Sequence, residues 1–531
     1  MTFNKYFIFA ALFFTPLSAL AAASPDARAL LDKHTAFVGW KSGDAALESW
    51  RFSGTRSNGN GIIDQFSEVR RGLVFRDTIA NPDRTLTLEH GFTGRVMWDT
   101  DENGYIVTDL GGTARAGLDW DALFDEAIGV AEDAAVVGAA QVRGTPTQIV
   151  RVQATGGLPM DLYEDSASGS YLRAVVDPGT PGAQTLEIDG YVTAAPGKKI
   201  IGSYDFDGRH YDIATVVPGA VADSELTPPK PHATWSFSPD PVSLDIYSYS
   251  PVSHEVRVRA TVNGETGTFL LTTGVAHIVL FEPFAAKAGL TNLGTSDFSD
   301  LLGSRYFEGY ARAATLTLGG NTLHDSIVER VADPNERIAG FLGFDFFAGM
   351  VADVRQSKGQ MQLFDPATYS TDLAAGAYAF PVDLTSRTPA VAITLKNGTM
   401  AYPRLDTASS YFMILSEDLR RRGKIDAADL TVQHTNPMIG STGPLGTMTE
   451  STPVDAQILA LDGSQGTGRC VVMRELYIGP YKYENPPLCF VGSNFFGDDG
   501  GLIGLDFLNH FDWIMDYAHA HVILTPTNTT K

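Results

Sequence analysis

Basic residues are scarce in this 531-residue chain. It holds 39 Lys and Arg against 62 Asp and Glu, a formal net charge of −23, and its longest basic cluster is the triplet at residues 420–422. Nucleic acid and anionic membrane surfaces are therefore not expected as partners, because both are negatively charged. Charged residues make up 19% of the chain and hydrophobic residues 44%, which predicts a folded protein rather than a disordered one.

Several catalytic signatures are missing as well. The chain has no Gly-x-Ser-x-Gly elbow, no phosphate-binding loop and no dinucleotide fingerprint. No cofactor is therefore expected. His519 and His521 alternate on an expected final strand and would share one face, but no third ligand is in view, so no metal site is expected there either.

Cysteine is nearly absent, since only Cys470 and Cys489 occur. Nothing else with metal-ligand spacing lies near them, which argues against a zinc site. The two are placed symmetrically about Gly479 and Pro480, so we expect them to face each other across a hairpin. In an exported protein they would form a disulfide, which would stabilise the fold by roughly 3 kcal/mol.

Export is predicted by residues 1–23, which have the pattern of a secretory signal peptide. Lys5 supplies the positive charge, residues 6–17 the apolar core, and three alanines at 21–23 the small-residue cleavage site. The apolar core is short for a membrane anchor, so we expect no membrane span after cleavage. The mature protein is expected in the periplasm or outside the cell.

Residues 24–225 are predicted to form an antiparallel β-domain. Short runs of alternating polar and apolar residues are separated by Gly, Asn and Asp, and one helix is expected at 25–38. Segments 82–84, 96–99 and 161–163 resemble the curved-sheet lipoprotein-carrier domains that precede protease-like halves in some bacterial proteins. Five prolines in residues 226–242 then predict an extended linker and the main domain boundary.

The rest of the chain contains two similar segments. An alternating strand leads into an Asn-Gly turn at 263–264 and again at 397–398, and a second strand then leads into FLLTTGV (269–275) or PRLDTASS (403–410). Both the turns and the sites lie 134 residues apart, which predicts an internal duplication. Each segment closes on a Gly-rich motif, GFLGFDFF at 340–347 and GLIGLDFL at 501–508. Asp345 and Asp506 in these motifs are expected to cap the helices that follow.

These paired motifs resemble the retropepsin-like aspartic proteases, in their bacterial periplasmic branch. The resemblance covers residues 243–526, and it implies two β-barrel lobes related by a pseudo-twofold axis, at 243–372 and 373–531. It also implies hairpin flaps near residues 299–309 and 437–446 over a cleft that holds an extended peptide. The predicted fold is therefore mainly β, with the curved antiparallel domain first and the two lobes after it.

The chemistry of such a site needs two carboxylates that share a proton, one acting as a base on water and the other as an acid toward the peptide carbonyl. By the family pattern each segment contributes an Asp, but here the positions hold Thr272 and Asp406. Asp406 is the one expected catalytic residue. The supporting positions of the family fall on Thr273 and Gly274 in the first segment and on Thr407, Ala408 and Ser409 in the second. A hydroxyl at Ser409 can bond the carboxylate, whereas the first segment has Val275.

Three functions remain open at this point. The protein is interpreted as an exported aspartic-peptidase-like protein that binds peptides but is weak or inactive, because Thr272 replaces the first Asp. Alternatively, it is an active aspartic endopeptidase that takes a second acid from elsewhere. A third alternative is a periplasmic binding or carrier protein that acts through residues 24–225. The sequence does not identify the substrate or the oligomeric state.

Overall fold

The structure is a computed structural model, and it describes residues 23–40, 49–58, 61–109, 133–153, 158–180, 183–206, 208–248, 255–295, 307–332, 337–370, 373–395, 398–425, 454–459, 465–492 and 500–527. The fold is mainly β, as the sequence predicts. The predicted signal peptide, apart from Ala23, and the second flap lie outside the described residues, as does most of the first flap. No helix within the described residues has the length and apolar character needed to cross a membrane.

The chain divides into two compact units. Unit 1 comprises residues 1–77, 91–97 and 109–227, and unit 2 comprises residues 78–90, 98–108 and 228–531. Two short segments of the N-terminal third thus group with the C-terminal part of the chain. The sequence gives no indication of this grouping.

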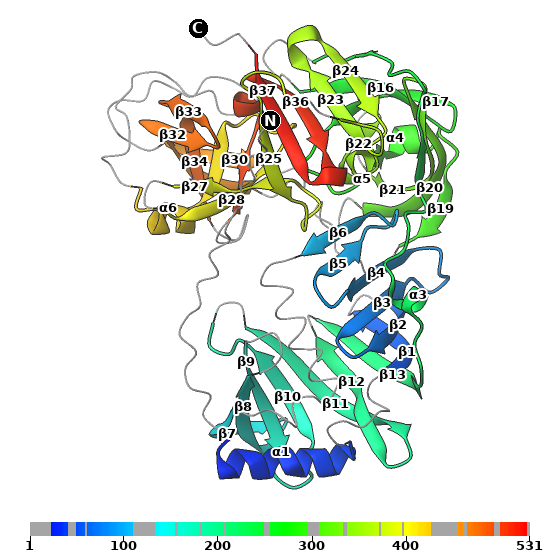
Figure 1. Cartoon of the computed structure of the whole chain (residues 1–531), viewed down its shortest axis with the longest axis vertical. Coiled ribbons are helices and arrows are strands. Elements are labelled where there is room, and N and C mark those ends of the chain that lie inside the picture. Colours follow the sequence, from blue (N-terminus) through cyan, green and yellow to red (C-terminus); the bar gives the residue numbers. More distant parts are fainter. Residues whose placement is uncertain are drawn as a thin grey trace, which may run out of the picture. The chain divides into compact units, whose positions relative to one another are not determined.

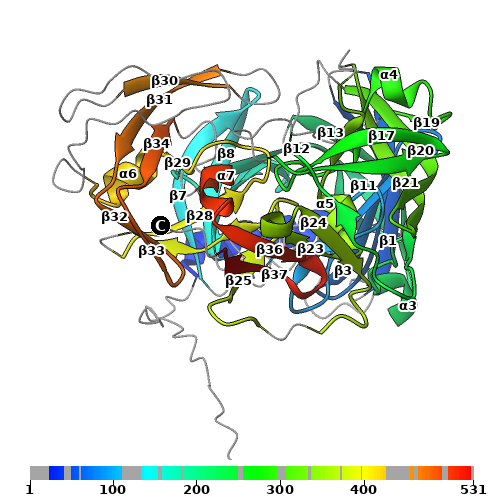
Figure 2. The ribbon, with the colours of Figure 1, turned by 90° about the horizontal axis from the view of Figure 1, so that it is seen from above.

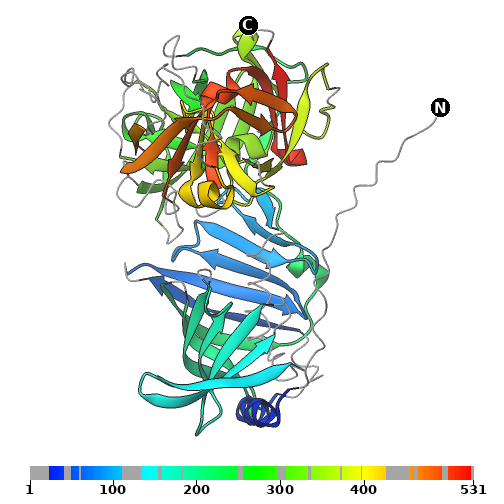
Figure 3. The ribbon, with the colours of Figure 1, turned by 90° about the vertical axis from the view of Figure 1, so that its left-hand side faces the viewer.

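A 13-stranded sheet contains most of the N-terminal strands, in the order β6-β5-β4-β3-β2-β1-β13-β12-β11-β10-β9-β8-β7 (Figures 1 and 3). Neighbours in the sheet are also neighbours in sequence except at the pairing of β1 with β13, so the sheet is two meanders joined by that pair. Its strands are β1 (Ser49–Asn58), β2 (Ile63–Arg71), β3 (Val74–Ala80), β4 (Thr87–Phe92), β5 (Met97–Thr100), β6 (Ile106–Asp109), β7 (Ala134–Val142), β8 (Thr145–Gln153), β9 (Pro159–Asp165), β10 (Tyr171–Val176), β11 (Gln184–Ala195), β12 (Lys198–Phe206) and β13 (Arg209–Pro218).

Helix α1 (Pro25–Val38) has the bounds that the sequence predicts. Ser24 caps it by accepting a hydrogen bond from the backbone of Ala27, and Pro25 opens it. Its buried residues Ala27, Leu31, His34 and Val38 recur at helical spacing, so one face is apolar and packs on the strands β7 and β12. The helix is therefore held by its buried face and by a conventional cap.

Unit 2 contains a barrel. Six strands in the order β21-β18-β22-β17-β16-β20 close because β20 also pairs with β21, and β14 and β19 extend the sheet. The bounds are β14 (Thr234–Ser236), β16 (Arg257–Val262), β17 (Glu265–Leu271), β18 (Val279–Phe281), β19 (Thr291–Gly294), β20 (Phe307–Leu318), β21 (Asn321–Val331) and β22 (Gly340–Leu342), with helices α4 (Glu282–Ala285) and α5 (Phe344–Ala348) along the chain. Helix α3 (Asp223–Leu226) belongs to unit 1. The Asn263-Gly264 turn joins β16 to β17 with both residues at positive φ, as predicted.

A second sheet of unit 2 runs β15-β24-β23-β36-β37-β25-β26-β28-β35-β29-β34-β31-β30, with β27 on β28 (Figure 2). Its strands are β15 (Leu244–Asp245), β23 (Val351–Arg355), β24 (Gln360–Phe364), β25 (Tyr378–Asp383), β26 (Ala390–Val391), β27 (Ile393–Thr394), β28 (Met400–Leu405), β29 (Met413–Ser416), β30 (Val454–Leu459), β31 (Gln465–Val472), β34 (Pro487–Val491), β35 (Gly500–Ile503), β36 (Phe511–Asp516) and β37 (His521–Pro526). The hairpin β32 (Glu475–Ile478) and β33 (Tyr481–Glu484), helices α6 (Glu417–Arg422) and α7 (Leu505–Leu508), and the 3₁₀ turns η3 (Gln356–Lys358) and η5 (Tyr517–His519) complete the unit.

The two segments with similar sequence have the same strand pattern. β17 runs parallel to the closing strand β22, which is antiparallel to β18, which in turn is parallel to β21. In the second segment β28, β35, β29 and β34 repeat these orientations in the same order. Strands β23 and β36 pair between the two segments, so the second sheet contains strands from both halves.

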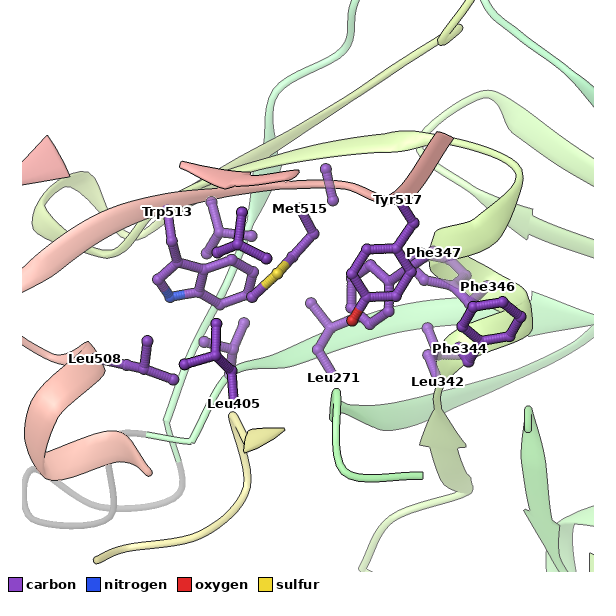
Figure 4. Close-up of a cluster of buried hydrophobic side chains, with 14 of the residues drawn as sticks. Leu271, Leu342, Phe344, Phe346, Phe347, Leu405, Leu508, Trp513, Met515 and Tyr517 are labelled. Atoms are coloured by element: carbon purple, nitrogen blue, oxygen red, sulfur yellow. The ribbon is translucent and has the colours of Figure 1, made fainter. Parts of the chain in front are cut away.

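The main hydrophobic core includes residues of both halves, and Figure 4 shows a part of it. Leu271, Leu342 and Phe347 from the first half pack in one cluster with Leu405, Leu508 and Trp513 from the second. Trp513 has 0% of its surface exposed. Full burial of a large apolar side chain stabilises a protein by about 2–3 kcal/mol. Leu271 and Leu405 belong to this cluster, so their burial holds the ends of the strands that lead into the two turns.

The predicted disulfide is confirmed. Cys470 on β31 and Cys489 on β34 are direct cross-strand partners and are bonded. The hairpin between them turns at Gly479, which has positive φ, and its register Glu475↔Glu484 is centred on the same point. The symmetric placement seen in the sequence therefore reflects one continuous antiparallel register.

Two expectations are wrong in detail, that for Asp345 and Asp506 and that for His519. Asp345 and Asp506 do not cap helices, because the N-cap positions of α5 and α7 are Gly343 and Gly504 and each Asp lies in the first turn. His519 lies in the 3₁₀ turn η5 and not on the final strand. In this turn its Nδ1 is 2.8 Å from Oδ1 of Asp516. Part of the expected linker is the strand β14, which pairs with β21.

Candidate functional site

Two tight turns form the centre of the candidate site. β17 ends at Leu271 and is followed by Thr272, whose N–H donates to the carbonyl of Leu342 at 3.1 Å. β28 ends at Leu405 and is followed by Asp406, whose N–H donates to the carbonyl of Ile503 at 2.9 Å. Each turn is thus anchored to its own closing strand by the same bond.

Thr273 and Thr407 interlock beneath the two turns. The Thr273 hydroxyl donates to the carbonyl of Leu405 at 2.6 Å and accepts from the N–H of Thr407 at 3.2 Å. The Thr407 hydroxyl donates to the carbonyl of Leu271 at 3.0 Å and accepts from the N–H of Thr273 at 3.2 Å. Both side chains are fully buried, so these four reciprocal bonds hold the two turns in a fixed relative position.

Asp406 faces Thr272 across this junction. The Thr272 hydroxyl donates to Oδ1 of Asp406 at 3.3 Å, and the same Oδ1 accepts from the N–H of Ala408 at 2.8 Å. Gly274 permits this approach, because a Cβ at that position would lie 2.7 Å from the carboxyl carbon of Asp406. The two sequence positions expected to form the site are therefore in hydrogen-bond contact.

The pKa of Asp406 is raised above its ordinary value. Burial among protein atoms is the main cause, and hydrogen bonds from the Ala408 backbone, the Thr272 hydroxyl and the Ser409 backbone oppose it. Ser409 acts on this pKa through its backbone, whereas its hydroxyl was the group expected from the sequence. Within the part of the chain that the structure describes, the groups that shift this pKa include no second carboxylate.

The two closing motifs approach the turns in the same way. The carbonyl of Val275 accepts from the N–H of Phe344 at 3.0 Å, and the carbonyl of Ser409 accepts from the N–H of Leu505 at 2.6 Å. Gly343 and Gly504 allow the contact, because a Cβ on either would lie 2.4 Å from a turn carbonyl oxygen. The paired glycines of the two motifs are thus explained by close backbone approach.

A buried polar cluster lies next to the first turn, and the sequence gives no hint of it. His277 Nδ1 is 3.4 Å from Glu102 Oε2 and 3.7 Å from Asp345 Oδ2, and its Nε2 is 3.5 Å from Glu329 Oε1. These acids hold the pKa of His277 well above its ordinary value although burial opposes the shift. Burial raises the pKa of Asp345, and burial and the nearby acids raise that of Asp101.

Asn103 joins this cluster to the barrel. Its Nδ2 donates to the carbonyl of Ile327 and to Oδ2 of Asp345, both at 2.9 Å, and its Oδ1 accepts from the N–H of Ile327 at 2.7 Å. Tyr310 donates to Glu102 at 2.8 Å. Residues 98–108 are therefore built into the first half of unit 2, which explains their grouping with it.

A possible metal-ligand group occurs elsewhere. Asp189, Asp205 and His210 have ligand atoms within 4.8 Å of one another among the described residues. Both acids are exposed, and Asp189 already forms an ion pair with Arg143. We assign no metal site to this group, because Arg143 competes with any metal ion for the carboxylate of Asp189.

One protein-family model matches part of the chain. Residues 258–346 match a family model described as "Aspartyl protease". The match covers the segment that contains Thr272 and ends within the first closing motif, while Asp406 lies outside it. No curated protein matches the chain.

Solved structures with some likeness include a DUF1329 family protein from Desulfovibrio piger, at 13% identity and a TM-score of 0.28, covering 39% of this chain and 98% of that one. Another is a putative outer membrane lipoprotein-sorting protein domain from Vibrio parahaemolyticus, at 7% identity and a TM-score of 0.27, covering 38% of this chain and 95% of that one. At these scores the likeness carries no conclusion about this chain.

Proposed function

We propose that this protein is exported and binds extended peptides at the site centred on Asp406, with weak or no hydrolysis of the bound peptide. The observation that carries the proposal is the hydrogen bond of 3.3 Å from the Thr272 hydroxyl to the Asp406 carboxylate. A hydroxyl occupies the place where an aspartic peptidase would have its second carboxyl. The match of residues 258–346 to an aspartyl protease family model supports the ancestry of this site.

The chemistry follows from the two groups. In an aspartic peptidase one carboxylate takes a proton from water while the other donates a proton toward the peptide carbonyl. The Thr272 hydroxyl donates a hydrogen bond to Asp406, but its high pKa makes it a poor source of a proton for the leaving amine. Asp406 alone can orient a water, and hydrolysis is therefore slow or absent.

The retained framework supports peptide binding. The interlocked Thr273 and Thr407 keep all four of their bonds, and the matching closing motifs keep their close approach to the turns. This paired arrangement also supports our proposal that the two halves arose by duplication. An extended peptide suits such a site, because its backbone bonds the walls while alternate side chains occupy opposite sides.

The test is binding of a peptide library in which the central peptide bond is replaced by a non-hydrolysable hydroxyethylene group. Retained peptides are identified by mass spectrometry and their affinities measured by fluorescence anisotropy on the full chain. Asp406→Ala should weaken binding about 10-fold or more, because the central hydroxyl loses a charge-assisted hydrogen bond. Asp512→Ala, which removes an acid that bonds Ser357, is the matched control and should bind normally. Equal binding by Asp406→Ala and the natural protein would refute the proposal.

A further inference from the structure

Arg404 lies on β28, two residues before Asp406 of the candidate site. Asp406 follows the end of β28, and its N–H still bonds the carbonyl of Ile503 on β35. Side chains alternate along such an extended segment, so Tyr402, Arg404 and Asp406 are directed to one side while Pro403 and Leu405 are directed to the other. The burial pattern agrees, because Pro403 and Leu405 are buried whereas Tyr402 is exposed and Arg404 half-buried. The guanidinium therefore shares a side of the strand with the carboxylate of the candidate site.

Arg404 has no ionic partner in the described residues. Its direct cross-strand neighbours are Ala390 on one side and Leu502 on the other, and neither carries a charge. Burial lowers the pKa of Arg404, and no acid of the described chain offsets that effect. Placing a charged group among protein atoms without a partner is costly, so a ligand that supplies the counter-charge would be favoured.

Three other arginines that are buried or half-buried each have an acidic partner. Arg56 contacts Asp64 at 2.8 Å, Arg70 contacts Glu68 at 2.5 Å, and Arg387 contacts Asp99 at 2.5 Å. The chain is also strongly acidic, with 62 acidic residues available. Unlike these three arginines, the half-buried Arg404 has no acid against it in the described residues.

The corresponding position of the first segment is apolar. Leu270, which lies 134 residues before Arg404, is buried in a cluster with Val275, Val279 and Phe341, and Ala408 packs against this cluster. The position two residues before Thr272 is therefore apolar and buried, whereas the matching position before Asp406 has a cationic side chain. This asymmetry would give a bound peptide one preferred direction.

We propose that Arg404 selects peptides with a carboxylate next to the peptide bond held at Asp406. The inference rests on the proposed peptide-binding function and names the class of peptide. Two residues along a strand span about 6.6 Å, the same spacing that separates alternate side chains of an extended ligand. An Asp or Glu on a residue flanking the central bond can therefore reach the guanidinium, which forms bidentate bonds with carboxylates.

The experiment uses the full chain and pairs of labelled peptides that differ only in Glu against Gln at a flanking position. Each pair is made with a free and with an amidated C-terminus, since a chain end also supplies a carboxylate. Glu peptides should bind about 10- to 100-fold more tightly than Gln peptides, as expected for a hydrogen-bonded charge pair. Arg404→Met should abolish this difference, and Arg404→Lys should retain part of it. Arg420→Met, which removes an arginine paired with Glu417, is the matched control and should keep the full difference.

Each result has a distinct meaning. A preference that follows the free C-terminus and disappears in Arg404→Met supports carboxylate recognition and assigns it to the chain end. Equal binding of Glu and Gln peptides with either C-terminus refutes the role of Arg404 and leaves the peptide-binding function intact. Absence of binding by every peptide, including the hydroxyethylene library, refutes the proposed function itself.

Discussion

Asn103→Ala is the substitution that most sharply tests how residues 98–108 belong to unit 2. The side chain is 0% exposed and makes three hydrogen bonds, two with the backbone of Ile327 and one with Asp345. Truncation to Ala leaves the Ile327 N–H, the Ile327 carbonyl and one carboxylate oxygen without this partner in a dry interior. Each unsatisfied buried group costs about 1–3 kcal/mol, so the combined loss should be about 3–5 kcal/mol after partial relaxation.

The assay is hydrogen exchange measured by mass spectrometry on a peptide that contains Ile327, whose amide donates to Asn103. The free energy of opening at this amide should fall by the stated amount, and urea unfolding of the full chain should show unit 2 unfolding earlier. Asn292→Ala is the control, because its side chain is exposed and only accepts a bond from the N–H of Gly294, at an irregularity of strand β19. It should cost less than about 1 kcal/mol. A loss below about 1 kcal/mol for Asn103→Ala would show that the segment does not support the barrel.

Further predictions concern stability. The double variant Cys470→Ala, Cys489→Ala should lose about 3 kcal/mol in urea unfolding, because the disulfide closes a loop with a sequence separation of 19; an unchanged midpoint would refute this. Asp406→Asn should raise the melting temperature at pH 7 but not at pH 3. Because the pKa of Asp406 is raised in the folded protein, the ionised carboxylate destabilises the fold at a pH above the ordinary pKa of an Asp, and Asn removes that charge. Thermal melts at pH 7 and at pH 3 test this. The pKa of His277 is raised in the folded protein, so protonation of this side chain stabilises the fold fully below about pH 6.5, and the stabilisation is lost as pH rises through the folded pKa. The urea midpoint of the natural protein should therefore fall between pH 6 and 9, and His277→Gln should make this fall smaller. An unchanged slope would contradict the prediction.

Local patterns account for what the sequence predicts well. The helix at Pro25–Val38, the turn at Asn263-Gly264 and the disulfide depend on residues near one another in the chain or in one hairpin register. The hydrogen bond between Thr272 and Asp406 joins residues 134 positions apart, at equivalent positions of the two similar segments.

Long-range burial accounts for what the sequence does not show. Asp345 has the residue type of a helix cap, but its carboxylate bonds Asn103 and lies near His277, partners 242 and 68 positions away in the sequence. A simple cut in the proline-rich segment at 226–242 would leave the barrel without the covalently attached residues 98–108 that unit 2 contains. Neither the periodicity nor the composition of the sequence indicates the contacts of Asp345 or the place of residues 98–108 in unit 2.

The most direct test of the account is peptide hydrolysis at pH 4 by the natural protein and by Thr272→Asp. We expect little or no hydrolysis by the natural protein and a gain of roughly 100-fold or more in Thr272→Asp, the scale of acid–base catalysis. Thr272→Asn, of the same size without the acid, should show no gain, and Asp406→Asn added to Thr272→Asp should abolish it. If the Ala408 methyl misplaces the restored pair, Ala408→Gly in the same background should recover the activity. Robust hydrolysis by the natural protein that is lost in Asp406→Asn would contradict the account, because it would require a second acid from another residue or from a partner chain.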